Sequence, residues 1–154
     1  MRLVGDGPLR QGLEQQARTL GIDANVVFVG HQRDVAAWIQ QARLFVLTSD
    51  SEGLSLSLVE AMLCGLPAVV SAVGDLGDLV ENDVNGYLVS DRSPQAFALR
   101  IVALLTDPDR WTRFSQAARN SAERYGIAEA SGLWSAILAD PDPTFTCRFP
   151  AEGD

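Results

Sequence analysis

Residues 44–70 of this 154-residue chain read LFVLTSDSEGLSLSLVEAMLCGLPAVV, and they indicate the fold class. The stretch opens with the apolar run Leu44–Leu47, passes through a serine-rich turn, continues with an apolar helical pattern, and closes with a second apolar run, Ala68–Val70. Gly65 and Pro67 mark the place where the helix must end. Short apolar strands joined by a helix are typical of a parallel sheet that is covered on both faces.

The same alternation extends in both directions from this stretch. We predict strands near residues 2–5, 26–29 and 87–89, helices near residues 8–20, 34–41 and 76–81, and two or three further helices from residue 94 to about residue 139. The predicted fold is therefore α/β, a Rossmann-like three-layer α/β/α sandwich with a parallel sheet. Ligands bind such sheets at the carboxyl ends of the strands, here after Val4, Val29, Leu47 and Val70.

The predicted domain covers residues 1–139. Beyond it, residues 140–154 carry three prolines and five charged residues in place of a periodic pattern, so we expect a disordered tail. No apolar run approaches the roughly 20 residues that span a bilayer, and no signal peptide is visible. Two cysteines, Cys64 and Cys147, do not make a disulfide framework, and we expect a cytoplasmic protein.

The charge of the chain is negative and unevenly distributed. The formal net charge of −8 argues against nucleic acid as a partner. No basic residue falls between Arg43 and Arg92, whereas eight acidic residues do. A phosphate bound by this part of the chain must therefore be neutralised by something else.

The loop after Leu47 is the main candidate site. A strand, a glycine-containing turn and a helix start form an anion site, because free backbone N–H groups and the positive end of the helix favour a phosphate. Glu52 precedes the helix and Glu60 lies inside it, so their carboxylates can hold hydroxyl groups on either side of that phosphate. The alternative is structural: Ser57-x-x-Glu60 has the form of a capping box, and Glu52 is then a solvated loop acid. Spacing alone leaves both interpretations open.

Five motifs in chain order carry a resemblance to a known family. They are Gly5-Asp6-Gly7-Pro8, Val27-Phe28-Val29-Gly30, the Glu52-x7-Glu60 pair with its surroundings, Gly65-Leu66-Pro67, and Asn85-Gly86-Tyr87-Leu88-Val89. Over about Arg2 to Leu105 the chain resembles the C-terminal, donor-binding domain of family-four (group 1) retaining glycosyltransferases. Their GT-B fold has two facing Rossmann-like domains. The family's double glycine and following glutamate correspond here to Gly74-Asp75 and Asp78, so that acid is one methylene shorter.

The resemblance implies a role for each candidate residue. Glu52, the catalytic residue, would hold donor-sugar hydroxyls, and Glu60 would hold the ribose. The backbone amides of Gly53, Leu54, Ser55, Leu56 and Ser57 would meet the sugar and the diphosphate. Gly30 and His31 would lie near the base, with an exposed loop position as the alternative for His31. Gly5 and Gly7 would let the backbone approach the ligand closely. The family uses no metal, so no cofactor is expected, and the Asp140-Pro141-Asp142 pair is expected to be solvated.

The implied activity is hexosyl transfer from a nucleoside diphosphate sugar to a saccharide, lipid or other acceptor. The resemblance also implies missing parts: the first strand–helix unit, whose arginine and lysine neutralise the diphosphate, and the whole N-terminal acceptor domain. We therefore expect the isolated chain to be inactive and to depend on that domain or on a complementing chain for activity. Any association with a membrane is expected to be peripheral and to occur only through the missing half. The alternatives are a stand-alone nucleotide-sugar-binding module and an inactive gene fragment. A flavodoxin-like signalling domain is disfavoured because no phosphoacceptor cluster follows the strands.

Overall fold

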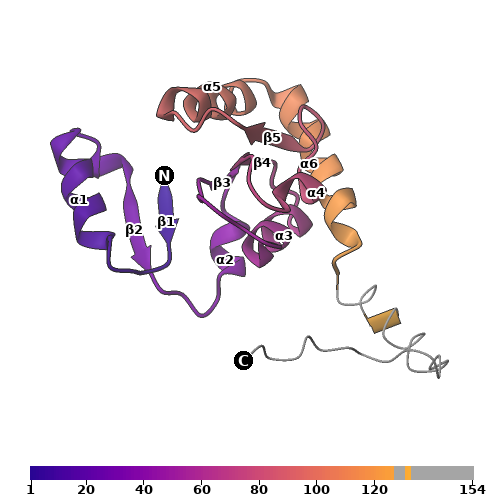
Figure 1. Cartoon of the computed structure of the whole chain (residues 1–154), viewed down its shortest axis with the longest axis horizontal. Helices are drawn as coiled ribbons and strands as arrows, with labels where there is room; N and C mark the ends of the chain where they lie inside the picture. Colours follow the sequence, from indigo (N-terminus) through magenta and orange to yellow (C-terminus); the bar gives the residue numbers. More distant parts are fainter. Residues whose placement is uncertain (127–130, 133–154) are drawn as a thin grey trace, which may run out of the picture. The chain divides into compact units, whose positions relative to one another are not determined.

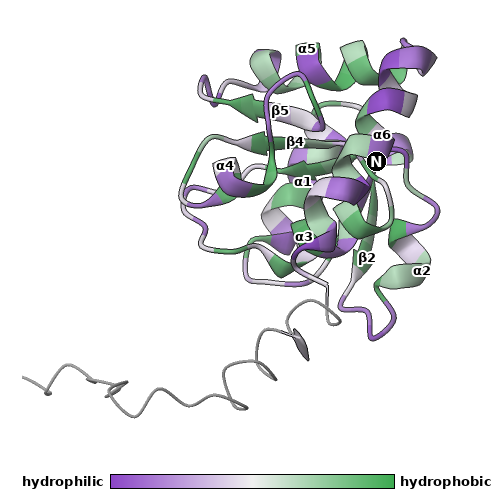
Figure 2. Cartoon of the chain, turned by 90° about the vertical axis from the view of Figure 1, so that its right-hand side faces the viewer, coloured by the Kyte–Doolittle hydropathy of each residue, from purple (hydrophilic) through white to green (hydrophobic). Residues whose placement is uncertain are grey.

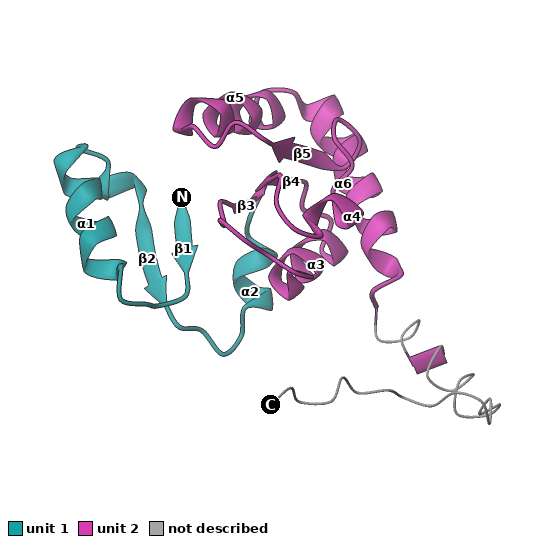
Figure 3. Cartoon of the chain, viewed as in Figure 1, with its two compact units in different colours: residues 1–42 teal, residues 43–154 magenta. Residues whose placement is uncertain are grey.

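The computed structural model describes residues 1–126 and 131–132, and the chain divides into two compact units (Figure 3). Unit 1 comprises residues 1–42, and unit 2 comprises the described residues from Arg43 onward. The predicted tail over residues 140–154, the predicted boundary at residue 139 and the end of the predicted last helix lie outside the described residues.

Unit 1 contains two parallel strands and the segments that connect them (Figure 1). Its elements are β1 (Arg2–Val4), α1 (Arg10–Thr19), the 3₁₀ turn η1 (Asp23–Asn25), β2 (Val27–Gly30) and α2 (Ala36–Ile39). Leu3 pairs with Phe28, and the register then shifts by one residue. α2 is shorter than the predicted helix over residues 34–41, and the Ala37 amide donates to Asp34 Oδ1 just before it.

Unit 2 is built on a three-stranded parallel sheet. Its strands are β3 (Phe45–Leu47), β4 (Ala68–Ser71) and β5 (Gly86–Val89), in the order β3-β4-β5. Val46 pairs with Val69, and Val69 pairs with Tyr87. The predicted parallel arrangement of the strands is confirmed within each unit. β1 and β3 each have one hydrogen-bonded neighbour among the described strands.

Helices cover both faces of the unit 2 sheet. They are α3 (Leu56–Leu63), α4 (Leu76–Leu79), α5 (Pro94–Leu105) and α6 (Pro108–Glu123). One buried cluster joins Leu58 and Met62 of α3 to Val70 of β4, and the other joins Val69 to Phe97 of α5. The side chains of successive β4 residues thus point to opposite faces of the sheet, as expected for a β-strand. Figure 2 shows the apolar colour of β4 and β5. The predicted three-layer arrangement is confirmed within this unit.

The ends of the long helices follow from their sequences. Pro94 and Pro108 occupy first-turn positions, where a missing N–H is harmless. The Ala96 amide donates to Ser93 Oγ, and the Arg110 amide donates to Asp107 Oδ1. Across residues 1–126 and 131–132, no helix combines the length and apolar character needed to cross a membrane.

Candidate donor-binding site

The loop between β3 and α3 presents a row of free backbone N–H groups. Ser55 is the N-cap of α3 in an extended conformation, and no side chain caps the helix. The amides of Leu58 and Val59 both donate to the Ser55 carbonyl. The amides of residues 53–57 have no hydrogen-bond acceptor within the described part of the chain. These amides precede the positive end of a helix, which is an arrangement that binds anions.

The carboxylate of Glu52 is held in place. Glu52 is partly buried, and Ser49 Oγ donates to its Oε1 at 2.6 Å. The Glu52 side chain is therefore oriented by its own loop. Sequence reasoning missed Ser49, whose only signal was its position three residues before Glu52 in a serine-rich turn. The role of Glu52 toward a sugar stays a prediction.

The capping-box interpretation of Glu60 is wrong. The helix begins at Leu56 with Ser55 as its N-cap, so Ser57 already lies inside the first turn. Ser57 Oγ contacts Ser55 Oγ at 3.2 Å. The Glu60 side chain is exposed and has no hydrogen-bond or ion-pair partner among the described residues. It is therefore available for a ligand, although its predicted contact with ribose is untested.

The predicted base-side residues lie in unit 1. The Gly5 amide donates to the Gly30 carbonyl at 2.9 Å, and both glycines have positive φ, +124° and +76°. The positive φ of Gly30 favours glycine at this position, whereas the atom that a Cβ would meet at 3.0 Å, Arg10 Nη1, ends a flexible side chain. Gly7 is exposed, and a Cβ at that position would meet nothing within 4 Å. The structure thus brings Gly5 and Gly30 together. His31 follows them as an exposed side chain.

Charged side chains fix the neighbouring glycine loop. Arg10 pairs with Asp6 at 3.0 Å and with Glu14 at 2.9 Å. The hydrogen bonds that Arg10 donates to the carboxylate of Glu14, and then to that of Asp6, raise the pKa of Arg10. The described residues include no group of three or more His, Cys, Asp or Glu side chains that could hold a metal ion. Metal independence stays a prediction, and Asp140 and Asp142 lie outside the described residues.

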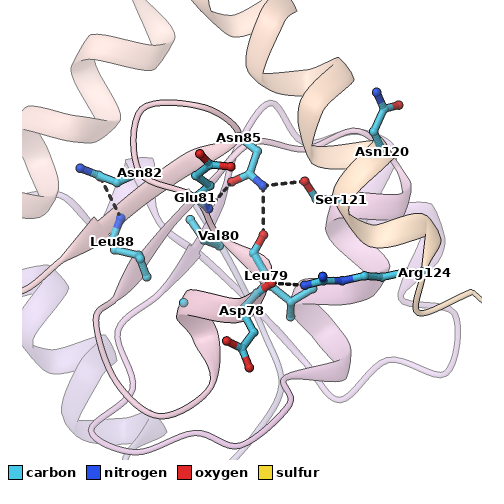
Figure 4. A pocket seen from close by; sticks show the side chains of 11 residues that line it. Asp78, Leu79, Val80, Glu81, Asn82, Asn85, Leu88, Asn120, Ser121 and Arg124 are labelled. Carbon is cyan, nitrogen blue, oxygen red and sulfur yellow. Dashed lines mark hydrogen bonds between the residues drawn. The ribbon is translucent and has the colours of Figure 1, made fainter.

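One described cavity lies away from the predicted site. It has a volume of about 620 Å³ and lies between the turn before β5 and the end of α6, at the amino end of that strand (Figure 4). Asn85, 1% exposed, forms its polar centre. Asn85 Nδ2 donates to the Leu79 carbonyl and to Ser121 Oγ, and its Oδ1 accepts from the Glu81 amide. This amide is fully hydrogen-bonded, so we assign Asn85 a structural role, which the sequence suggested only through its place in a turn motif.

Comparisons with known proteins agree with this architecture. Residues 1–121 match the family described as glycosyl transferases group 1. An uncharacterized glycosyltransferase of Haemophilus influenzae is 30% identical over 139 residues, which are 90% of this chain and 39% of that protein. HepE of Anabaena, solved in complex with UDP, matches with a TM-score of 0.82 and 28% identity, over 90% of this chain and 40% of that chain. The C-terminal domain of a group 1 glycosyl transferase (LpcC) from Francisella tularensis matches with a TM-score of 0.70 and 25% identity, over 77% and 63%.

This chain spans about two fifths of the length of the Haemophilus relative and of HepE. The shared parallel α/β architecture is Rossmann-like, and it occurs in these proteins as part of a GT-B fold. From the family match and these structural likenesses, the chain belongs to the group 1 glycosyltransferases and corresponds to their C-terminal domain.

Proposed function

We propose that this chain binds the nucleoside diphosphate sugar donor of a retaining glycosyltransferase, with the diphosphate at the start of α3. The observation that carries the proposal is the run of free amides over residues 53–57. Successive N–H donors next to a helix N-terminus favour an anionic group. HepE has been solved with UDP and with UDP-glucose, which supports a nucleotide sugar as the source of that anion.

The proposed roles follow the positions of the side chains around these amides. Glu52, oriented by Ser49, holds hydroxyl groups of the transferred hexose and acts as the catalytic residue. Glu60 extends from α3 with an unengaged carboxylate and holds the ribose. In unit 1, Gly30 and His31 contact the base, and Gly5 and Gly7 let the backbone approach the ligand closely. The reaction proceeds with retention and without a metal ion.

The proposal includes dependence on further protein. A helix N-terminus is worth only about 0.3–2 kcal/mol toward an anion. Enzymes lower barriers by about 8 kcal/mol or more, so the departing diphosphate needs additional cations. The chain spans 39% of its Haemophilus relative, and we propose that an acceptor domain or a complementing chain supplies the rest of the catalytic cleft and any peripheral membrane contact. The isolated chain then binds the donor without transferring its sugar.

The sharpest test removes one amide donor without disturbing the helix. Leu56 is the first residue of α3, where proline is tolerated, and Ser55 before it is already extended, with ψ 103°. Its side chain is 69% exposed, so Leu56→Pro sacrifices little packing. We expect Leu56→Pro to weaken UDP binding by about 1.5–3 kcal/mol, the scale of a hydrogen bond to a charged group.

The matched control is Leu56→Ala, which loses the same side chain and keeps the N–H. Isothermal titration with UDP, GDP and UMP on the parent and both variants gives the affinities, and UDP release from UDP-glucose reports turnover. Equal UDP affinities for Leu56→Pro and Leu56→Ala would show that the diphosphate does not bind at the start of α3. A parent chain that binds no nucleoside diphosphate would refute the proposed function, and rapid turnover would refute its dependence on further protein.

A further inference from the structure

A second described cavity, of about 370 Å³, lies at the carboxyl edge of the unit 2 sheet. Its lining comes from the segments that follow all three strands: Thr48 and Asp50 after β3, Ser71 at the end of β4, and Arg92, Pro94 and Phe97 after β5. None of these residues belongs to the donor-binding set predicted from the sequence. The cavity therefore needs its own explanation.

The floor of this cavity contains an unsatisfied hydroxyl group. Ser71 is the last residue of the middle strand and is 1% exposed. Its Oγ is the one buried side-chain oxygen or nitrogen, within residues 1–126 and 131–132, that has no hydrogen-bond partner. Folded proteins pair nearly all such atoms, so an unpaired hydroxyl at a ligand-binding edge indicates a partner that arrives with the ligand.

An ion pair spans the end of the middle strand beside this hydroxyl. Asp50, on the segment after β3, contacts Arg92, on the segment after β5. The side chains are 92% and 45% exposed, and ion pairs exposed to this degree contribute little to stability. Both partners can therefore exchange each other for a ligand at little loss in stability.

The chemistry of the lining selects a neutral, hydroxyl-rich ligand. The carboxylate of Asp50 disfavours an anion, and the guanidinium of Arg92 disfavours a cation. Two neighbouring hydroxyl groups satisfy both, because a hydroxyl donates to the carboxylate and accepts from the guanidinium. Thr48 and Ser71 add two hydroxyl partners, while Pro94 and Phe97 provide an apolar wall. The volume falls within the range of small-molecule sites.

We propose that this cavity is a hexose subsite, in which Asp50, Ser71 and Arg92 bind the hydroxyl groups of the sugar. The inference rests on the proposed function and adds a second group of sugar-contacting residues to Glu52. The hexose comes either from the donor or from a saccharide acceptor, since both present adjacent ring hydroxyls.

The test compares ligands with and without a sugar on Ser71→Ala and Arg92→Gln. Titration with UDP, with UDP-glucose, and with methyl α-D-glucopyranoside at saturating UDP separates the two sources. We expect Ser71→Ala and Arg92→Gln to weaken a sugar-bearing ligand by roughly three- to tenfold, with UDP affinity within about twofold. Ser71→Ala should leave the melting temperature unchanged or raise it, because it deletes an unpaired buried hydroxyl. Ser90→Ala and Arg113→Gln, at exposed positions, are the matched controls.

Each outcome decides the proposal. A loss confined to UDP-glucose assigns the subsite to the donor sugar, and a loss confined to the free glucoside assigns it to the acceptor. Equal losses for UDP and UDP-glucose, or none, would overturn the hexose subsite while leaving nucleotide binding intact. Loss of inorganic phosphate binding in Arg92→Gln would overturn it in favour of an anion site. If the parent chain binds no UDP, the proposed function fails. The hexose subsite is then tested separately, by the NMR chemical shifts of the amides near residues 48–50, 71 and 92 when the glucoside alone is added.

Discussion

Gly74 lies directly against the backbone of Glu52. A Cβ at position 74 would come within 1.7 Å of the Glu52 carbonyl oxygen, and Gly74 has a positive φ of +52°. The turn after β4 and the loop after β3 can pack this closely only because position 74 has no side chain. This contact places the Glu52 loop on the carboxyl edge of the sheet, and it explains physically why a glycine stands where the family has one.

Gly74→Ala should displace the Glu52 loop. The new methyl group meets backbone rather than a flexible side chain, and its φ is unfavourable for alanine, so we expect a loss of about 2 kcal/mol or more in the free energy of unfolding. Urea denaturation followed by circular dichroism measures it. Gly77→Ala is the matched control, because its Cβ would make only an ordinary contact with Leu88 and α4 favours alanine. Similar stabilities for the two variants would show that the loop adapts.

Ser49→Ala should affect the sugar end of the ligand and not the nucleotide. The change removes the 2.6 Å hydrogen bond that orients the Glu52 carboxylate. We expect UDP-glucose to bind about 0.5–1.5 kcal/mol more weakly, with UDP affinity and stability nearly unchanged. Calorimetric titration with both ligands measures the difference, and Ser49→Thr, which keeps the hydroxyl, should restore it. A parallel loss of UDP affinity would mean that Ser49 supports the whole loop.

Glu60→Gln tests the proposed ribose contact. Glutamine keeps the size of the side chain but offers one acceptor and places an N–H₂ donor toward the hydroxyls. We expect UDP affinity to fall by about 1.5–3 kcal/mol while the free energy of unfolding stays within about 0.5 kcal/mol. Thermal unfolding and UDP titration on the same sample measure both quantities, with Glu123→Gln at an exposed position as the control. An unchanged UDP affinity of Glu60→Gln would show that Glu60 does not contact the ribose.

Asn85→Ala should lower stability without changing nucleotide binding. The variant loses three hydrogen bonds and leaves the Leu79 carbonyl and the Glu81 amide without their partner. We expect a loss of about 2–4 kcal/mol in the free energy of unfolding, and unchanged UDP affinity at a temperature where the variant is folded. Denaturant titration measures the first and calorimetry the second. The exposed Asn120→Ala is the control, and weakened UDP binding by folded Asn85→Ala would give the cavity in Figure 4 a role in the site.

The sequence by itself determined the local structure and the type of sheet. Apolar runs such as Ala68–Val70 predicted buried strands, and Gly65 and Pro67 predicted the end of α3, because these signals depend on a few neighbouring residues. The alternation of strands with helices predicted parallel pairing, since short loops do not join parallel strands directly. The same reasoning located the candidate site in the loop after β3, where the structure finds the free amides.

Only the tertiary structure decided which local options were used. Ser57-x-x-Glu60 satisfied the capping pattern, but the helix starts two residues too early for it, with Ser55 as the N-cap. The contact of Gly74 with Glu52, and the meeting of Asp50, Ser71 and Arg92, join segments that lie 20 or more residues apart in the chain. The local sequence around each residue does not predict such contacts, because they depend on which strands become adjacent in the sheet.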